Sequence, residues 1–250
     1  MQSPRDRFLT VMGRKPVIEA LHDESLEIDK VLISSKAQGA EINTIAGMAM
    51  SRKIAMERVS EQKVTAVARS SRHHQGVVAD VVAPEMQHLS DFCEQRRRGK
   101  DWACSVLVLD HVHNPANVGM ILRSATAAGV DGVVVPHKGT ADIGPVAIKA
   151  SAGVAFKAPI LRCEDMAEAM ALLVDHRFAI VGLDAGGESI VEATLPERAA
   201  FVIGNESDGL SVAALAACDQ TLSIPVDNGV ESLNAAVAAS LVAYEIRRNR

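Results

Sequence analysis

The 250-residue sequence contains few aromatic residues, no long apolar run and no cysteine pair. Phe, Trp and Tyr make up only 3% of the chain, which argues against recognition of single-stranded RNA by a row of stacked rings. No run reaches the ~18 apolar residues that a membrane span needs, and the chain does not begin with an apolar segment of signal-peptide length. The sequence therefore predicts a cytoplasmic protein without a membrane partner.

Metal and redox motifs are also absent. The four cysteines, Cys93, Cys104, Cys163 and Cys218, lie far apart and form no C-x-x-C pair, so we expect reduced thiols in the core and no metal site. The H-E-x-x-H, G-x-S-x-G, Walker and G-x-G-x-x-G motifs are missing as well. These absences exclude the commonest kinds of metalloprotease, serine hydrolase, P-loop nucleotidase and dinucleotide-dependent oxidoreductase.

Charge is distributed unevenly along the chain. Residues 1–100 carry a formal charge of +3 and residues 101–250 a charge of −8, which together give the net charge of −5. A basic N-terminal part on an acidic C-terminal part suits a protein whose first part docks on a polyanion while the second performs chemistry. Ordinary variation among solvated charges explains a charge of +3 equally well, so this pattern decides nothing alone.

The hydrophobic pattern predicts two α/β units. In the first, we expect strands at 30–33, 53–56 and 76–82, a helix that opens at Pro16, and helices at 42–50 and 64–68. In the second, strands at 105–110, 132–135, 178–183, 200–203 and 221–224 alternate with helices at 118–128, 165–174, 211–217 and 232–247. This alternation is typical of a doubly wound parallel sheet with helices on both faces. The expected division is a domain at 1–84, a polar linker at 85–102 and a domain at 103–250.

Three polar clusters follow predicted strands of the second unit, at residues 113–119, 204–209 and 225–234. Ligands of parallel α/β sheets bind beyond the carboxyl ends of the strands, so we expect one shared site rather than three unrelated turns. Asn117 is expected to cap a helix and Arg123 to lie in its second turn. An arginine on a largely buried helix is costly unless it meets an anion. Each cluster taken alone is equally compatible with a turn or a helix cap.

Together the clusters resemble a known family. Residues 114–125 (NPANVGMILRSA), 202–211 (VIGNESDGLS) and 224–234 (IPVDNGVESLN) look like the three ordered motifs of the SpoU (TrmH-like) RNA 2′-O-methyltransferases of the SPOUT superfamily. Residues 13–21 (GRKPVIEAL) and 73–79 (HHQGVVA) are similar to the RNA-binding domain of the branch that methylates a guanosine of 23S rRNA. The chain departs from the usual motifs at four positions, Met120, Val226, Asn228 and Ala235.

This resemblance implies a fold, a cofactor and partners. The C-terminal α/β domain would be threaded as a deep trefoil knot whose loops hold S-adenosyl-L-methionine, and the N-terminal domain would be ribosomal-protein-L30e-like. Family members form homodimers through the C-terminal domain. The implied reaction is 2′-O-methylation of a ribose, with 23S rRNA favoured over tRNA as the RNA partner.

The motifs also imply roles for individual residues. Arg123 matches the family's catalytic residue, and because a guanidinium is a poor proton acceptor, we expect it to bind a phosphate and the developing alkoxide while water or a phosphate oxygen takes the proton. The other residues expected to act in catalysis are Asn117, Glu206, Ser232 and Asn234. The residues expected to bind the cofactor are Leu183, Ile203, Gly204, Ile224 and Leu233, with Gly182 and Ala185 as further candidates. The residues expected to contact RNA are Arg14, His73, His74, Gln75, Lys149 and Ser151.

Three alternatives stay open. A tRNA ribose methyltransferase would share every catalytic motif. A non-catalytic RNA-binding factor for ribosome assembly would have little reason to keep Arg123, Glu206, Ser232 and Asn234 together. A small-molecule α/β enzyme would leave the basic N-terminal unit without a use.

Overall fold

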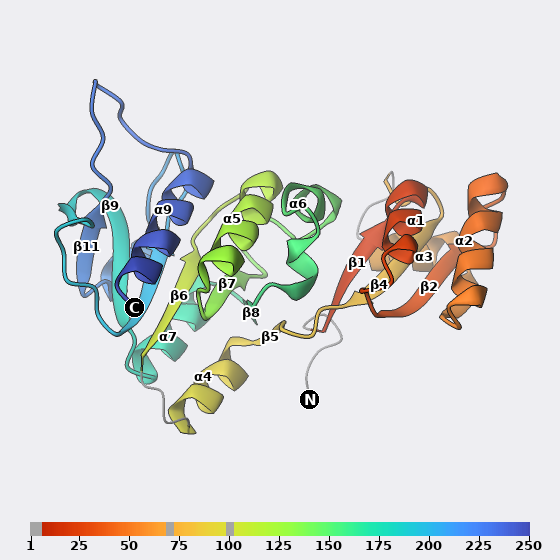
Figure 1. The fold of residues 1–250 in the computed structure, drawn as a ribbon, viewed down its shortest axis with the longest axis horizontal. Helices are drawn as coiled ribbons and strands as arrows, with labels where there is room; N and C mark the ends of the chain where they lie inside the picture. Colours follow the sequence, from red (N-terminus) through yellow and green to blue (C-terminus); the bar gives the residue numbers. More distant parts are fainter. Residues whose placement is uncertain (1–6, 69–72, 99–102) are drawn as a thin grey trace. The chain divides into compact units, whose positions relative to one another are not determined.

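The computed structural model describes residues 7–68, 73–98 and 103–250. The chain divides into two compact units, Met1–Pro84 and Glu85–Arg250 (Figure 1). Among the described helices, none is long and apolar enough to cross a membrane.

The N-terminal unit is built on a mixed four-stranded sheet in the order β1 (Phe8–Met12), β4 (Val77–Val82), β2 (Ile28–Ser34) and β3 (Ala55–Val59). Strand β4 runs antiparallel to β1 and β2, whereas β3 is parallel to β2. Helix α3 (Glu61–Ala68) packs on one face, and α1 (Arg14–His22) and α2 (Ala40–Ser51) pack together and against the sheet. Strands β1, β2 and β3 therefore end at the edge where β4 begins, and their loops meet there.

The C-terminal unit contains a seven-stranded parallel sheet. Its order is β11 (Gln220–Ser223), β9 (Ala179–Ser189), β10 (Arg198–Ile203), β6 (Cys104–Leu109), β7 (Gly132–Pro136), β8 (Ile160–Cys163) and β5 (Gln87–His88). Fully buried central strands explain the unbroken apolar runs in the sequence.

Helices cover this sheet in two layers. One core lies between the sheet and α4 (Leu89–Arg98), α7 (Met166–Asp175) and α8 (Val212–Ala217). On the other side, α5 (Pro115–Ala128) packs against both α6 (Pro145–Ala150) and α9 (Ala235–Arg248) (Figure 1). A short 3-10 helix, Val154–Lys157, follows α6. The expected α/β architecture, a parallel sheet with helices on both faces, is confirmed.

Several elements differ from the sequence expectation. Part of the expected linker forms β5 and α4, because Leu89, Phe92 and Cys93 recur at helical spacing and are buried despite their polar neighbours. Strands β1 and β8 and helix α6 were not predicted, since each is only four to six residues long and so carries little periodic signal. Strand β9 continues six residues beyond the expected end, from 184 to 189.

The cysteines lie where core thiols were expected. Cys93, Cys104 and Cys163 are buried and Cys218 is half-buried, all with free thiols. Burial raises the pKa of the Cys93 and Cys163 thiols to about 12 and that of Cys104 to about 11. These three thiols are therefore protonated and inert near neutral pH.

Candidate active site and RNA-binding edge

Three loops of the C-terminal unit meet at the ends of its strands, and we name this region the carboxyl edge (residues 110–117, 204–211 and 224–234). Asn117 Nδ2 donates a hydrogen bond to Glu206 Oε1. Asn234 Nδ2 donates to Asn117 Oδ1 at 3.2 Å and lies 3.4 Å from Glu206 Oε1. One residue from each of the three polar clusters therefore enters a single hydrogen-bonded group.

The helix caps explain how two of these residues are held. Asn114, not Asn117, caps α5, because its Oδ1 accepts from Ala116 N at 2.9 Å. Asn117 instead lies in the first turn, 2% exposed, with its amide turned to Glu206. Helix α9 begins later than the expected residue 232, and Asn234 caps it through Oδ1, which accepts from Ala236 N at 2.9 Å. The side-chain oxygen of Asn234 thus caps α9, while its Nδ2 group binds Asn117 and Glu206.

The Glu206 loop is a tight turn. Asn205 and Gly209 exchange two backbone hydrogen bonds of 2.9 and 3.0 Å, and Asn205 Oδ1 accepts from Ser207 N at 2.8 Å. A Cβ at Gly204 would lie 2.5 Å from the Gly209 backbone, so glycine is required for this closure. The turn presents Glu206 at an exposed tip.

Arg123 makes no hydrogen bond to Asn117, Glu206 or Asn234. It is exposed on α5, and within the parts of the chain that the structure describes it has no hydrogen-bond or ion-pair partner. The helix is largely buried, as expected, but Arg123 itself is not: the apolar neighbours Ile121, Leu122 and Ala125 point inward, and the helical period turns Arg123 outward. Ser232 is likewise exposed, without a hydrogen-bond partner among the described residues.

The expected cofactor residues lie in the carboxyl edge or in the strands next to it. Ile203 is buried at the end of β10, and Gly204, Leu183, Ile224 and Leu233 are half-buried. Gly182 lies in β9, where a Cβ would come within 2.7 Å of Leu210 and 2.8 Å of Cys218, so its role there is packing. Ala185 is exposed.

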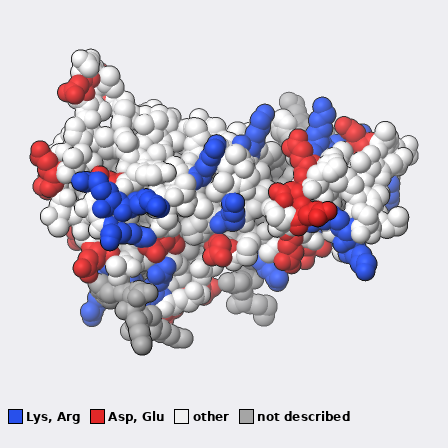
Figure 2. All heavy atoms as spheres, viewed as in Figure 1, with Lys and Arg blue, Asp and Glu red and all other residues white. Residues whose placement is uncertain are grey.

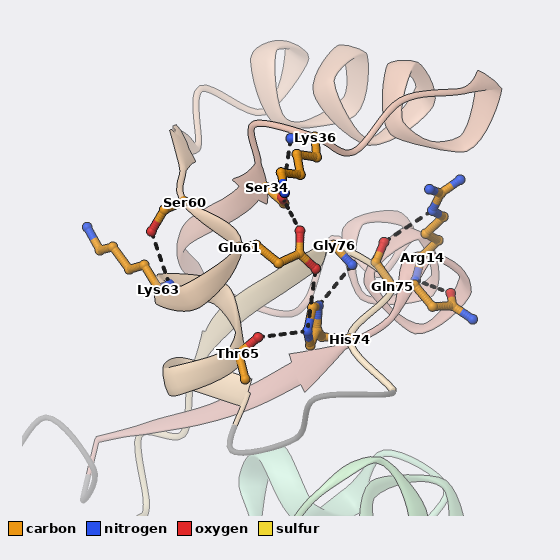
Figure 3. A network of polar contacts seen from close by, with 10 residues as sticks. All are labelled: Arg14, Ser34, Lys36, Ser60, Glu61, Lys63, Thr65, His74, Gln75 and Gly76. Carbon is orange, nitrogen blue, oxygen red and sulfur yellow. Dashed lines mark hydrogen bonds and ion pairs between the residues drawn. The ribbon is translucent and has the colours of Figure 1, made fainter.

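The N-terminal unit has its own polar cluster, which we name the N-terminal loop edge (residues 13–14, 34–37, 60–61 and 73–76; Figure 3). His74 is 2% exposed, and its Nδ1 accepts from Gly76 N at 2.9 Å. The ring proton is then on Nε2, which faces Thr65 Oγ1 at 3.2 Å and Glu61 Oε1 at 3.9 Å. The structure thus places His74 behind the surface, as a support for the loop rather than a group that faces solvent.

Arg14 and Gln75 form the outer part of this edge. Arg14 N donates to Gln75 Oε1 at 3.0 Å and Arg14 Nε donates to Gln75 O at 3.3 Å (Figure 3). The Arg14 guanidinium also lies 3.6 Å from the Glu41 carboxylate. Gln75 has a left-handed backbone, with φ of 49°. His73 and Gln75 are exposed and Arg14 is half-buried. Sequence reasoning did not single out Glu61, which also accepts a hydrogen bond from Ser34 Oγ.

The two remaining RNA candidates lie near α6 and differ from each other. Lys149 is exposed. Ser151 is fully buried, where its hydroxyl donates to Ile148 O at 2.7 Å and accepts from Ala155 N at 3.1 Å. Figure 2 shows separate Lys and Arg side chains, not one continuous basic patch, over α5 and α6. Ser151 is therefore a structural residue of the turn after α6.

Comparison with known proteins finds relatives for both parts of the chain. The SpoU rRNA Methylase family matches residues 105–244, and a family described as RNA 2′-O ribose methyltransferase substrate binding matches residues 10–87. A Staphylococcus saprophyticus protein assigned to the TrmH family of tRNA/rRNA methyltransferases is 35% identical over 245 residues, which cover 97% of this chain and 96% of the relative.

Two solved structures extend the comparison. The SpoU methyltransferase AviRb from Streptomyces viridochromogenes, crystallised with the cofactor AdoMet, is 26% identical with a TM-score of 0.64, and the match covers 98% of this chain and 91% of that one. A crystal structure of an RNA 2′-O ribose methyltransferase matches with 26% identity and a TM-score of 0.61, over 98% and 90% of the two chains. With both parts of the chain matched, this protein belongs to the SpoU (TrmH) family of RNA 2′-O-ribose methyltransferases.

Proposed function

We propose that the protein transfers the methyl group of S-adenosyl-L-methionine to a ribose 2′-hydroxyl, and that its substrate is a guanosine of 23S rRNA. The observation that carries this proposal is the hydrogen-bonded group of Asn117, Glu206 and Asn234, drawn from three loops. The N-terminal unit favours ribosomal RNA, because residues 13–21 and 73–79 resemble the RNA-binding domain of the 23S branch. A substrate of this kind places the protein in the cytoplasm.

The carboxyl edge fits the cofactor. Ile203, Leu183, Ile224 and Leu233 offer apolar walls, and half-buried Gly204 continues the chain from the end of β10. An adenosine moiety suits such walls together with a few backbone polar groups. S-adenosyl-L-methionine, when bound, supplies a methyl group activated by its sulfonium. The likeness to AviRb, which was crystallised with AdoMet, supports this assignment.

The residues of this chain would align the ribose and stabilise charge. Glu206 and Asn234 are exposed beside one another, so they can hydrogen-bond the ribose while buried Asn117 fixes their positions. Ser232, two residues before the α9 cap, offers a further hydroxyl. Arg123 has no partner in the described parts of the chain and is therefore available for the neighbouring phosphate and the developing alkoxide.

We further propose a homodimer through α5 and α9. The two helices lie side by side, joined by the 2.8 Å hydrogen bond between Ser240 and Ser124 (Figure 1). Their outer faces expose apolar side chains at helical spacing, each 42–53% exposed: Met120, Val237, Leu241 and Tyr244. An exposed apolar face of this kind is typical of a protein interface. Arg123 lies one turn after Met120, so the RNA site would adjoin the interface.

Two finer features of the fold belong to the same proposal. The resemblance to the family supports a deep trefoil knot in the C-terminal unit and an L30e-like fold in the N-terminal unit. We assign RNA binding to the domain at 1–84, with Arg14, His73 and Gln75 as its contact residues, His74 as their support and Lys149 as a contact from the other unit. The methyltransferase domain, which we expected at 103–250, would begin with β5 and α4.

Methyl transfer to two RNAs in parallel tests the proposal. Radiolabelled S-adenosyl-L-methionine is incubated with 23S rRNA and with bulk tRNA, and Arg123→Ala serves as the inactive control. We expect label on rRNA at an alkali-resistant ribose and none with Arg123→Ala. Absence of label from both RNAs and from precursor ribosomal particles would contradict the proposal and leave a non-catalytic assembly factor as the better account.

A tRNA substrate is the second candidate. The observation that favours it is the naming of the Staphylococcus relatives for both tRNA and rRNA. Label on tRNA alone would move the assignment to this candidate.

A further inference from the structure

A carboxylate and a histidine outside the motif residues discussed above form a built pair at the carboxyl edge. Asp110 follows β6 and its side chain is completely buried. Its Oδ1 lies 2.6 Å from His111 Nδ1, and its Oδ2 accepts from Ser211 N at 2.6 Å. Both oxygens are therefore engaged, and the imidazole is held with Nδ1 toward the protein. Neither residue was singled out by sequence reasoning, although a charged residue directly after a buried strand is the signal that could have found it.

The backbone of His111 is held in a costly conformation. Its φ is 55°, in the left-handed region that side-chain-bearing residues rarely adopt. Its carbonyl oxygen accepts from Asn205 Nδ2 at 2.9 Å, and Asn205 directly precedes Glu206. Strained residues of this kind persist where their surroundings over-determine them, commonly at functional sites. His111 is thus tied by one bond to the Glu206 loop and by another to buried Asp110.

The imidazole ring of His111 is held by neighbouring residues but stays partly exposed to solvent. It packs against Gly139, where a Cβ would lie 3.2 Å from Nε2, and it makes a T-shaped contact with the ring of His113 at a centroid distance of 5.8 Å. Next to Gly139, Lys138 pairs with Glu164 at 2.9 Å. The His111 side chain is still 47% exposed. A ring needed only for packing has no reason to stay half in solvent on a strained backbone.

We propose that His111 is a substrate-binding residue, whose Nε2 hydrogen-bonds a backbone phosphate of the RNA beside the target nucleotide, and that Asp110 is its positioning residue. The inference rests on the proposed function, because it requires RNA at the carboxyl edge. Nδ1 donates to Asp110, so Nε2 carries a proton only in the imidazolium form, and it is this form that makes the contact: Nδ1–H donates to the buried carboxylate and Nε2–H donates to a phosphate oxygen. A phosphate is the recognised group because its negative charge complements that of the imidazolium. The bond from His111 to Asn205 couples this contact to the Glu206 loop.

His111→Asn is the most direct test. Asparagine tolerates the left-handed backbone, and its amide can replace Nδ1 as donor to Asp110, so the variant removes little except the Nε2 group. The assay measures methyl transfer to 23S rRNA made by transcription, together with RNA affinity by fluorescence anisotropy and the thermal midpoint. We expect the KM for RNA and the RNA Kd to rise about tenfold, the value of a charge-assisted hydrogen bond, with kcat and the midpoint unchanged. The matched control, His113→Asn, should change the Kd less than twofold.

Asp110→Asn and the RNA binding of the wild-type protein distinguish the role of His111 from the proposed methyl transfer. Asp110→Asn should raise the RNA KM without a matching loss of kcat, whereas a purely structural role would lower stability and kcat together. An unchanged RNA Kd in His111→Asn, with wild-type protein that binds RNA, would overturn the inference. If wild-type protein binds RNA but transfers no methyl group, the proposed function fails while the anisotropy still decides the role of His111. Wild-type protein that binds no RNA would overturn both.

Discussion

At the N-terminal loop edge the central polar residue lies inside, whereas in the C-terminal unit the groups expected to do chemistry lie outside. His74 is 2% exposed, and Arg14 and Gln75 bind each other. Glu206, Ser232 and Arg123 are exposed instead, and Arg123 has no partner within the described segments. The N-terminal loop edge thus has its polar groups paired with one another, which suits the recognition role proposed above. The C-terminal unit keeps exposed polar groups available for a ligand, with buried Asn117 and Asp110 as supports.

Arg123→Ala tests the exposed groups of the C-terminal unit and has the largest expected effect. We expect kcat to fall about 10²–10³-fold, the usual loss when a group that stabilises developing charge is removed. The thermal midpoint should not change, because no described residue depends on Arg123. Steady-state methyl transfer and a thermal melt measure both quantities. Arg123→Lys keeps the charge without the planar fork and should recover only part of the activity; more than a tenth of wild-type kcat in Arg123→Ala would refute the assignment.

Leu241→Asp tests whether methyl transfer needs a second copy of the chain. Leu241 is 46% exposed in the apolar face formed by α5 and α9, so a carboxylate there should prevent the burial on which a dimer depends. We expect sedimentation to show a monomer with at least tenfold lower activity. Val174→Asp on α7, 53% exposed but outside this face, is the matched control. A dimer that survives Leu241→Asp would place the interface elsewhere.

His74→Ala tests the closed edge. It leaves Gly76 N and Thr65 Oγ1 without their partner, which should cost about 1–3 kcal/mol of stability in the N-terminal unit. Hydrogen exchange at residues 74–77 should become faster, and the KM for RNA should rise several-fold while kcat at saturating RNA is kept. His73→Ala, at an exposed neighbour, should cost less than about 0.5 kcal/mol. Equal losses of stability from His74→Ala and His73→Ala would show that the buried hydrogen bonds of His74 do not stabilise the N-terminal unit.

Arg14→Ala has the smallest expected effect and measures how much the recognition surface contributes to binding. Arg14 already pairs with Glu41 at 3.6 Å, so a phosphate contact would gain only part of its charge. We expect the RNA Kd to rise about threefold and the salt dependence of binding to weaken by about one phosphate contact. Lys53→Ala, before the start of β3 and thus at the opposite edge of the sheet, should leave the Kd unchanged. A lower kcat in Arg14→Ala would argue against separate roles for the two edges in RNA binding and in catalysis.

The basic side chains near the C-terminus show how surface charge can be misleading as a guide to function. Arg250 pairs with Asp131, Arg248 with Glu245, and Arg247 donates to Ala128 O at 3.4 Å. Figure 2 shows Lys and Arg side chains gathered near this end of α9. Arg247 and Arg250 thus tie the end of α9 to the end of α5 and the turn after it, and Arg248 pairs within α9 itself.

The sequence predicted those elements that are long enough to show a regular hydrophobic pattern. Buried strands such as Cys104–Leu109 and Arg198–Ile203 appear as apolar runs, and parallel strands bring their carboxyl ends to one edge. These two facts were enough to expect the loops of Asn117, Glu206 and Asn234 together. Short elements such as β8 and α6 were missed, because a few residues do not establish a period.

The sequence by itself determined the family, the two α/β units and the set of polar residues at the strand ends. Only the tertiary structure decided which of those residues turn inward, as His74, Ser151 and Asn117 do, and which stay outside, as His73, Glu206 and Arg123 do. Adjacent residues such as His73 and His74 are chemically identical in the sequence. Their directions depend on partners distant along the chain, because a polar side chain is buried only where tertiary contacts supply its hydrogen bonds.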